Sequence, residues 1–151
     1  MNGSLAIDVH GLTKSYGDKK VVDNVSISVK TGEITGFLGP NGSGKTTTIR
    51  MMCGLLHADA GSGTVLGYNI ATEAERIKRE VGYMTQKFSF YTDLTIEENL
   101  MFVARLYEMK PAKEKVDKTL ETLGLTTRRK QLAGSLSGGW KQRLALAACI
   151  M

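Results

Sequence analysis

The fold class follows from one stretch, Gly39-Pro40-Asn41-Gly42-Ser43-Gly44-Lys45-Thr46, which fits the pattern G-x-x-x-x-G-K-[ST]. Average residue usage makes such a match by chance rare, on the order of one per cent or less in a chain of this size. Glycines let a loop of this kind curl so that its N–H groups point inward, toward phosphate at the start of the next helix. The stretch therefore predicts a phosphate-binding loop.

The residues on either side have the periodicities that such a loop requires. Glu33 to Leu38 is a short β-rich run that we expect to form a strand. After Lys45 the apolar residues recur at i, i+3, i+4 and i+7, one face of a helix, as Ile49, Met52, Cys53 and Leu56. Strand, glycine-rich turn and helix is the expected context. The alternative, an Asn-Gly hairpin turn, is disfavoured because no alternating strand follows.

The loop predicts the binding of a nucleoside triphosphate with magnesium. Lys45 is placed to neutralise the β- and γ-phosphates, and the hydroxyl of Thr46 to bind Mg²⁺. The candidate nucleotide-binding residues in this segment are Gly39, Asn41, Gly42, Ser43, Gly44, Lys45, Thr46 and Thr47. The loop alone does not separate kinases, GTPases, helicases and transporter ATPases.

A second motif, Leu136-Ser137-Gly138-Gly139, precedes a predicted helix from Trp140 to Met151. Its N–H groups would form a second small anion-binding helix start. Taken alone, an ordinary Ser-Gly-Gly N-cap loop remains the alternative, because serine and glycine are common at helix starts.

Together the two motifs resemble the ATP-binding subunit of ABC transporters. Gly39 to Thr46 corresponds to the Walker A loop, and Leu136 to Gly139 to the family's LSGG signature. Gln86 stands where the family has its Q-loop glutamine, and Tyr16 matches the aromatic residue that stacks on adenine. The sequence from Gln86 to Asn99 most resembles the corresponding segment in subunits of drug- and antibiotic-export systems.

The resemblance implies an α/β fold: a P-loop NTPase core with an antiparallel N-terminal sheet and an inserted helical subdomain. Residues 1–87 would belong to the core, 88–136 to the helical subdomain, and 137–151 to the signature and its helix. It implies Lys45 and Gln86 as catalytic residues, Thr46 and Gln86 as magnesium ligands, and ATP as the nucleotide.

The resemblance also implies partners. The Walker A face would oppose Ser137, Gly138 and Gly139 of a second subunit, in a homodimer or with another ATP-binding subunit. ATP hydrolysis would drive a separate membrane subunit, contacted through the Q-loop segment. The chain would then work in the cytoplasm, at the inner face of the cell membrane.

The sequence departs from the family pattern in two respects. Trp140 stands where the family usually has Gln or Met. The 151 residues contain no Walker B aspartate, catalytic glutamate or switch histidine, and neither His10 nor His57 lies at the place of the last. We expect a chain truncated before Walker B, with negligible hydrolysis alone. The alternatives are a non-catalytic nucleotide-binding fragment and an ABC ATPase of a non-transport kind.

Composition is compatible with this interpretation. The net charge is +5, which permits an anionic partner. The cluster Arg128-Arg129-Lys130 has no interleaved aromatic residue, so it predicts a solvated face and no nucleic-acid partner. No apolar run approaches the roughly 20 residues of a membrane helix, and no signal peptide is apparent at the N-terminus. The two cysteines and two histidines lack metal-ligand spacing.

The remaining elements are predicted from local patterns. We expect strands at Leu5–Val9 and Val25–Val29, a turn and short strand within Gly61–Gly67, a helix at Glu73–Glu80 and a strand at Val81–Met84. Thr95 and Glu98 form a capping box before a helix whose buried face is Leu100, Val103, Ala104 and Tyr107. Pro111 opens the next helix, which has a stripe of Val116, Leu120 and Leu123 and ends at Gly124.

Overall fold

The computed structural model describes residues 4–85, 87 and 89–151, which form two compact units. Unit 1 extends to Val81 and unit 2 runs from Gly82 to Met151. The signature helix thus packs within the same unit as the other helices of unit 2. The subdomain boundaries expected at residues 87/88 and 136/137 remain a prediction.

Unit 1 is built on an antiparallel sheet with the strand order β2-β1-β3-β4. The strands are β1 (Leu5–Tyr16), β2 (Lys19–Lys30), β3 (Ala60–Val65) and β4 (Tyr68–Asn69). This confirms the expected antiparallel N-terminal sheet. The two predicted strand segments lie inside β1 and β2, which are longer because the hairpin between them continues to a turn at Gly17 (φ 57°).

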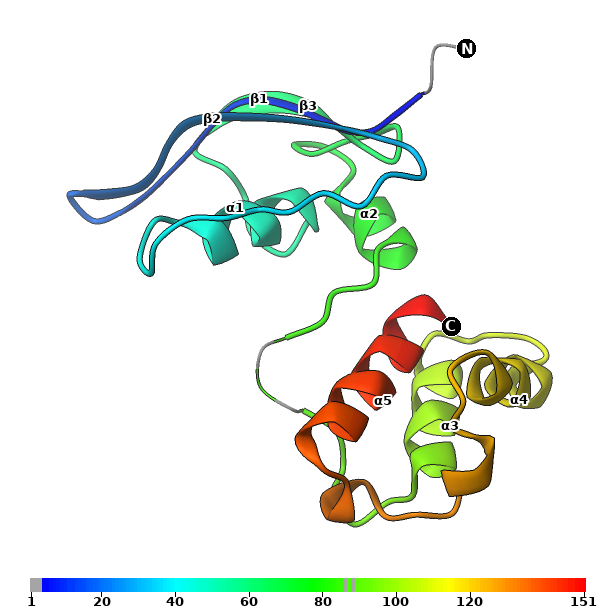
Figure 1. The fold of residues 1–151 in the computed structure, drawn as a ribbon. Coiled ribbons are helices and arrows are strands. Elements are labelled where there is room, and N and C mark those ends of the chain that lie inside the picture. Colours follow the sequence, from blue (N-terminus) through cyan, green and yellow to red (C-terminus); the bar gives the residue numbers. More distant parts are fainter. Residues whose placement is uncertain (1–3, 86, 88) are drawn as a thin grey trace. The chain divides into compact units, whose positions relative to one another are not determined.

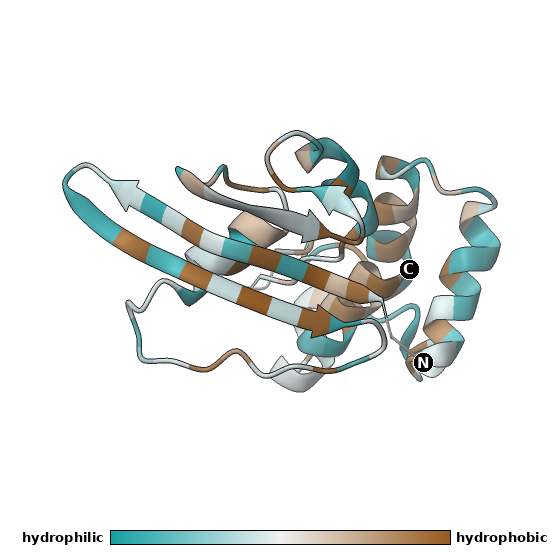
Figure 2. Ribbon diagram, turned by 90° about the horizontal axis from the view of Figure 1, so that it is seen from above, coloured by the Kyte–Doolittle hydropathy of each residue, from teal (hydrophilic) through white to brown (hydrophobic). Residues whose placement is uncertain are grey.

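Alternation along the strands places the core of unit 1 on one face of the sheet, and Figure 2 shows it as alternating bands along β1 and β2. Helices α1 (Lys45–Met52) and α2 (Ala74–Glu80) cover that face (Figure 1). The core consists of Val9, Leu12, Val22, Met51, Met52, Val65, Ile70 and Ile77. In α1 the buried positions are Thr48, Met51 and Met52. The predicted face is confirmed in part: Met52 is buried and Ile49 and Leu56 pack against the core, whereas the burial of Thr48 and Met51 was not predicted.

Two predicted strands are absent from the described residues. Glu33 to Leu38 is not a strand, and Ile34 and Leu38 are 103% and 92% exposed. The physical reason is that the four strands described in unit 1 pair among themselves, and none of them pairs with this segment. The segment at Val81–Met84 is also not a strand. Gly82 lies directly against the backbone of Cys149 instead, with no room for a Cβ.

Unit 2 is helical, with α3 (Ile96–Leu106), α4 (Ala112–Thr122) and α5 (Gly138–Ile150). Two 3₁₀ turns, η1 (Thr126–Arg128) and η2 (Ala133–Ser135), join α4 to α5. The apolar faces of the three helices and of the segments between them share one core. It consists of Ile96, Leu100, Ala104, Val116, Leu120, Leu125, Ala133, Leu136, Leu144 and Ala147. Among the described residues no helix has the length and apolar composition to cross a membrane.

Local signals for the helices of unit 2 are mostly confirmed. The Thr95–Glu98 capping box is present, and Gly124 has the predicted positive φ of 64°. The prediction that Tyr107 lies on the buried face of α3 is wrong. Tyr107 is the C-cap residue, where the helix ends, and it is 56% exposed. Pro111 is the N-cap of α4 and precedes its first turn.

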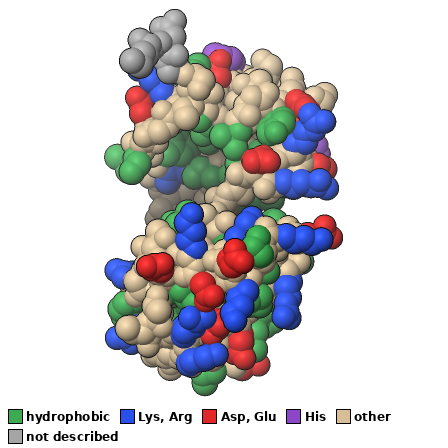
Figure 3. All heavy atoms as spheres, turned by 90° about the vertical axis from the view of Figure 1, so that its right-hand side faces the viewer, with side chains coloured by type: hydrophobic (Ala, Val, Ile, Leu, Met, Phe, Trp, Pro, Cys, Tyr) green, Lys and Arg blue, Asp and Glu red, His purple; other side chains and the backbone are tan. Residues whose placement is uncertain are grey.

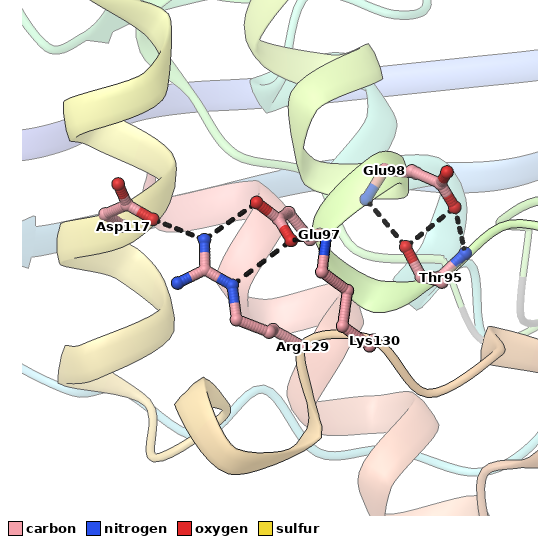
Figure 4. Close-up of polar contacts among 6 residues, drawn as sticks. All are labelled: Thr95, Glu97, Glu98, Asp117, Arg129 and Lys130. Carbon is pink, nitrogen blue, oxygen red and sulfur yellow. Dashed lines mark hydrogen bonds and ion pairs between the residues drawn. The ribbon is translucent and has the colours of Figure 1, made fainter.

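An ion cluster joins the start of α3 to α4 and to the segment after η1 (Figure 4). The Arg129 guanidinium donates to Glu97 at 2.7 and 3.1 Å and to Asp117 at 2.6 Å, and Lys130 lies 2.9 Å from Glu97. The hydrogen bonds from Arg129 and Lys130 lower the pKa of Glu97 to about 2. The cluster thus ties the chain leading to the signature to the first turn of α3.

Candidate nucleotide-binding site

The loop before α1 depends on glycine at two positions. Gly42 and Gly44 have φ of 81° and 86°, a conformation that L-residues rarely adopt. Gly44 also lies against β2: a Cβ there would overlap the carbonyl oxygen of Val21 and lie 3.0 Å from Val22 Cγ2. Close packing of the loop on β2 therefore requires the glycine that the pattern places at this position.

The start of α1 presents backbone donors that have no partner within the helix. The first intrahelical hydrogen bond runs from Thr48 N to Gly44 O at 2.8 Å, so the N–H groups of Lys45, Thr46 and Thr47 precede it. The first turn contains no acidic side chain. The helix dipole adds a partial positive charge at the same place, which favours an anion there.

The loop closes around the side chain of Lys45. Its ammonium donates to the carbonyl oxygens of Gly39 and Pro40, the second at 2.7 Å. Ser43 N donates to Pro40 O at 3.3 Å and closes the turn. The predicted residues Gly39 to Thr47 thus form one continuous loop and helix start, with Asn41, Ser43 and Thr46 exposed. The arrangement suits the phosphates of a nucleotide, because an ammonium and the first N–H groups of a helix lie in the same exposed segment.

Thr48 was not predicted to take part. It is 2% exposed, and its hydroxyl donates to Gly44 O at 3.0 Å, which fastens the loop to the first turn of the helix. The available signal was its position four residues after Gly44, where a hydroxyl reaches the i−4 carbonyl.

Tyr16 is the last residue of β1 and is 53% exposed. The hairpin turn that follows it lies at the same end of unit 1 as the loop before α1, in both Figure 1 and Figure 2. Lys14 Nζ is 5.9 Å from the centroid of the Tyr16 ring. The ring is therefore available to a flat ligand near the phosphate loop.

The signature residues form the start of α5. Ser137 is the N-cap, and Lys141 N donates to Ser137 O at 2.9 Å as the first helical bond. The N–H groups of Gly138, Gly139 and Trp140 precede that bond. A Cβ on either glycine would meet nothing within 4 Å among the described atoms. Packing inside unit 2 therefore does not explain why both positions are glycine.

Trp140 lies beneath two cations. The guanidinium carbons of Arg128 and Arg143 are 4.5 and 4.7 Å from its ring centroid, and Arg143 also donates to Leu123 O at 3.3 Å. Trp140, the residue that differs from the family pattern, thus links η1 to the first turn of α5 through cation–π contacts.

Other predictions concern residues outside the loop and the signature, namely Gln86, the cysteines and the histidines. Gln86 lies outside the described residues, so its predicted roles remain predictions. In the described part of the chain, no three His, Cys, Asp or Glu side chains form a metal-binding group. Burial raises the pKa of the Cys53 and Cys149 thiols.

The basic cluster Arg128–Lys130 belongs to a surface of mixed charge. Arg129 and Lys130 pair with Glu97. On the face of unit 2 drawn in Figure 3, Lys and Arg side chains alternate with Asp and Glu. The expected solvated face is confirmed only in part, because the Arg129 side chain is 30% exposed and pairs with both Glu97 and Asp117. The absence of a nucleic-acid partner remains a prediction.

The loop, the helix start and the signature define a P-loop protein of the ABC type. Residues 22–151 match the family model described as ABC transporter, and the chain belongs to that family.

Relatives and solved structures agree with that assignment. The chain is 42% identical over 99% of its length to the "Probable multidrug ABC transporter ATP-binding protein YbhF" of Escherichia coli, of which it covers 26%. It is 41% identical to the linearmycin resistance ATP-binding protein LnrL of Bacillus subtilis, with 96% and 47% covered. For the bacitracin transport ATP-binding protein BcrA of Bacillus licheniformis the identity is 41%, with 98% and 48% covered.

A solved ATP-binding subunit of an ABC transporter superposes with a TM-score of 0.80 at 28% identity, covering 97% of this chain and 61% of that one. An ATP-binding cassette in its ADP conformation gives the same score, with 96% and 64% covered. The match confirms the predicted fold class. The chain spans between a quarter and a half of the curated relatives named above.

Proposed function

We propose that this chain is the nucleotide-binding part of an ABC exporter and that it binds ATP with Mg²⁺ on the loop from Gly39 to Thr47. The observation that carries the proposal is that the Lys45 ammonium and the first N–H groups of α1, which have no partner within the helix, belong to one largely exposed loop and helix start. The names of the relatives, which include multidrug and bacitracin transport proteins, support the export class.

Each part of the site has a separate task. Lys45 moves its hydrogen bonds from the loop carbonyls to the β- and γ-phosphates, since an anion is the better acceptor for an ammonium. The N–H groups of the loop and of Lys45 to Thr47 hold the remaining phosphate oxygens. The Thr46 hydroxyl is exposed and supplies one magnesium ligand. Tyr16 stacks on adenine.

The signature glycines serve a second subunit. Gly138 and Gly139 have open space around them, which leaves room for the close approach of a phosphate held by another chain. The partner is a second copy or another ATP-binding subunit in a head-to-tail dimer. Gln86 is a magnesium ligand and catalytic residue, and its segment contacts a membrane subunit at the inner face of the cell membrane.

Hydrolysis by this chain alone is expected to stay near background. No residue after Glu121 in the printed sequence is acidic. These residues therefore offer no carboxylate beyond the signature to orient the attacking water or complete the metal shell, and phosphoryl transfer relies on positioning and charge stabilisation.

The test is the magnesium dependence of ATP binding, measured with a fluorescent ATP analogue with and without Mg²⁺. Thr46→Val removes the hydroxyl at nearly constant volume, and Thr46→Ser is the matched control that keeps it. We expect Mg²⁺ to strengthen binding to the parent chain and to Thr46→Ser but not to Thr46→Val. A magnesium effect that survives in Thr46→Val contradicts the assignment of Thr46, and a parent chain that binds no ATP contradicts the proposed function.

A further inference from the structure

The end of β1 that carries Tyr16 is a weakly supported part of the sheet. Pairing of β1 with β3 ends at Thr13, opposite Ala60. Beyond that point β2 is the only strand among the described residues that accompanies β1, with Ser15 opposite Lys20 and Tyr16 opposite Lys19. A two-stranded ribbon is marginal in water, so another contact is needed to hold Tyr16 in one place.

Asp59, the residue just before β3, supplies that contact with three successive residues of β1. Its backbone N–H donates to Thr13 O at 2.9 Å. One carboxylate oxygen accepts from Lys14 Nζ at 2.6 Å, and the other accepts from Ser15 N at 2.7 Å. The carboxylate thus extends the β3 side of the sheet by two residues after the backbone ladder has ended.

The same contact fixes Lys14. Its side chain is only 16% exposed, unusual for a lysine, and its ammonium lies between Asp59 and the Tyr16 ring. The ammonium is 5.9 Å from the ring centroid, near the limit for a cation–π contact. Asp59, Lys14 and Tyr16 therefore form a chain of contacts from the start of β3 to the aromatic ring.

We propose that Asp59 is a positioning residue of the base-binding site: by holding Lys14 and Ser15, it fixes Tyr16 where its ring can stack on the nucleotide base. This inference rests on the proposed function, because it presupposes that Tyr16 stacks on adenine. Asp59 itself touches no phosphate. Its contribution is to hold Tyr16 in place before the nucleotide arrives, so that less ordering accompanies binding.

The proposal distinguishes the base from the phosphates. Asp59→Asn removes the charge that holds Lys14 with little change in volume, and it should weaken MgATP binding by about threefold to tenfold, as expected for a lost positioning contact. Inorganic tripolyphosphate has no base, so its affinity should not change. Asp23→Asn is the matched control, because it breaks an exposed pair with Lys20 in the same hairpin.

A double-mutant cycle separates positioning from general stability. In a Tyr16→Ala background, Asp59→Asn should have almost no further effect on MgATP, since the ring that it positions is gone. Equal weakening of MgATP and tripolyphosphate, or equal effects of Asp59→Asn with and without Tyr16, would overturn the proposal. So would an unchanged affinity in a variant that keeps the parent's far-ultraviolet circular dichroism spectrum.

The outcomes also separate this inference from the proposed function. Lys45-dependent binding of MgATP with no effect of Asp59→Asn overturns the role of Asp59 and leaves the nucleotide site standing. Absence of Lys45-dependent binding in the parent chain overturns both.

Discussion

The fit of Gly44 against β2 yields a prediction with a matched control. Gly42 and Gly44 have nearly the same positive φ, 81° and 86°, but different surroundings. A Cβ at Gly42 would meet nothing within 4 Å among the described atoms, whereas one at Gly44 would overlap Val21 O. Comparing Gly44→Ala with Gly42→Ala therefore isolates the steric contact from the backbone strain that both share.

The magnitudes follow from these two causes. Left-handed backbone costs an L-residue roughly 1–2 kcal/mol, and this should be nearly the whole effect of Gly42→Ala. Gly44→Ala adds overpacking against the backbone of Val21 and the side chain of Val22, worth about 1–3 kcal/mol more. We expect the free energy of unfolding to fall by about 1–2 kcal/mol in Gly42→Ala and by about 2–5 kcal/mol in Gly44→Ala.

Urea denaturation followed by far-ultraviolet circular dichroism measures the difference. With a slope of about 2 kcal/mol per molar urea, an extra 2 kcal/mol moves the midpoint by about 1 M. Equal midpoints for the two variants would show that the loop does not pack on β2 as described, and would refute the steric argument.

Three further predictions concern the base, the ion cluster and hydrolysis. Tyr16→Ala should weaken ATP binding by roughly 1–3 kcal/mol, by analogy with other base–aromatic stacking, whereas Tyr16→Phe keeps the ring and should be mild; a Phe variant as poor as Ala in an ATP titration would argue for a hydroxyl role. The pKa of Glu97 is lowered from 4.5 to about 2, so its ion pairs stabilise the fold fully above about pH 4.5 and lose that effect as the pH falls toward 2. Glu97→Gln should flatten the decline of stability over that range in denaturation curves, and an unchanged slope would show that Glu97 is not coupled to folding. Phosphate release from MgATP by this chain alone should stay near background, and Lys45-dependent turnover of about 0.1 per second or faster would contradict this.

Features set by neighbouring residues could be predicted from the sequence. The pattern from Gly39 to Thr46 predicted the loop and the start of α1 because its glycines meet a local backbone requirement at Gly42 and Gly44. The capping box at Thr95 and Glu98 likewise depends on residues three apart.

Features that need a distant partner could not be predicted in this way. Strand formation requires a neighbouring backbone, and the β-rich run at Glu33–Leu38 has none among the described residues, so its composition was misleading. The role of Asp59 could not be predicted for a related reason: its contacts, Lys14 and Ser15, lie more than 40 positions away in the sequence. Only the pairing of β1 with β3 brings them together.

The central claim is that the loop around Lys45 is an ATP site. Its most direct test compares the parent chain, Lys45→Ala and the control Lys30→Ala, a lysine at the end of β2, by titration with a fluorescent ATP analogue in the presence of Mg²⁺. Loss of a charge-assisted phosphate contact should cost about 1.5–3 kcal/mol, which is more than tenfold in affinity, and Lys30→Ala should bind like the parent. Equal affinities for the parent chain and Lys45→Ala would contradict the claim.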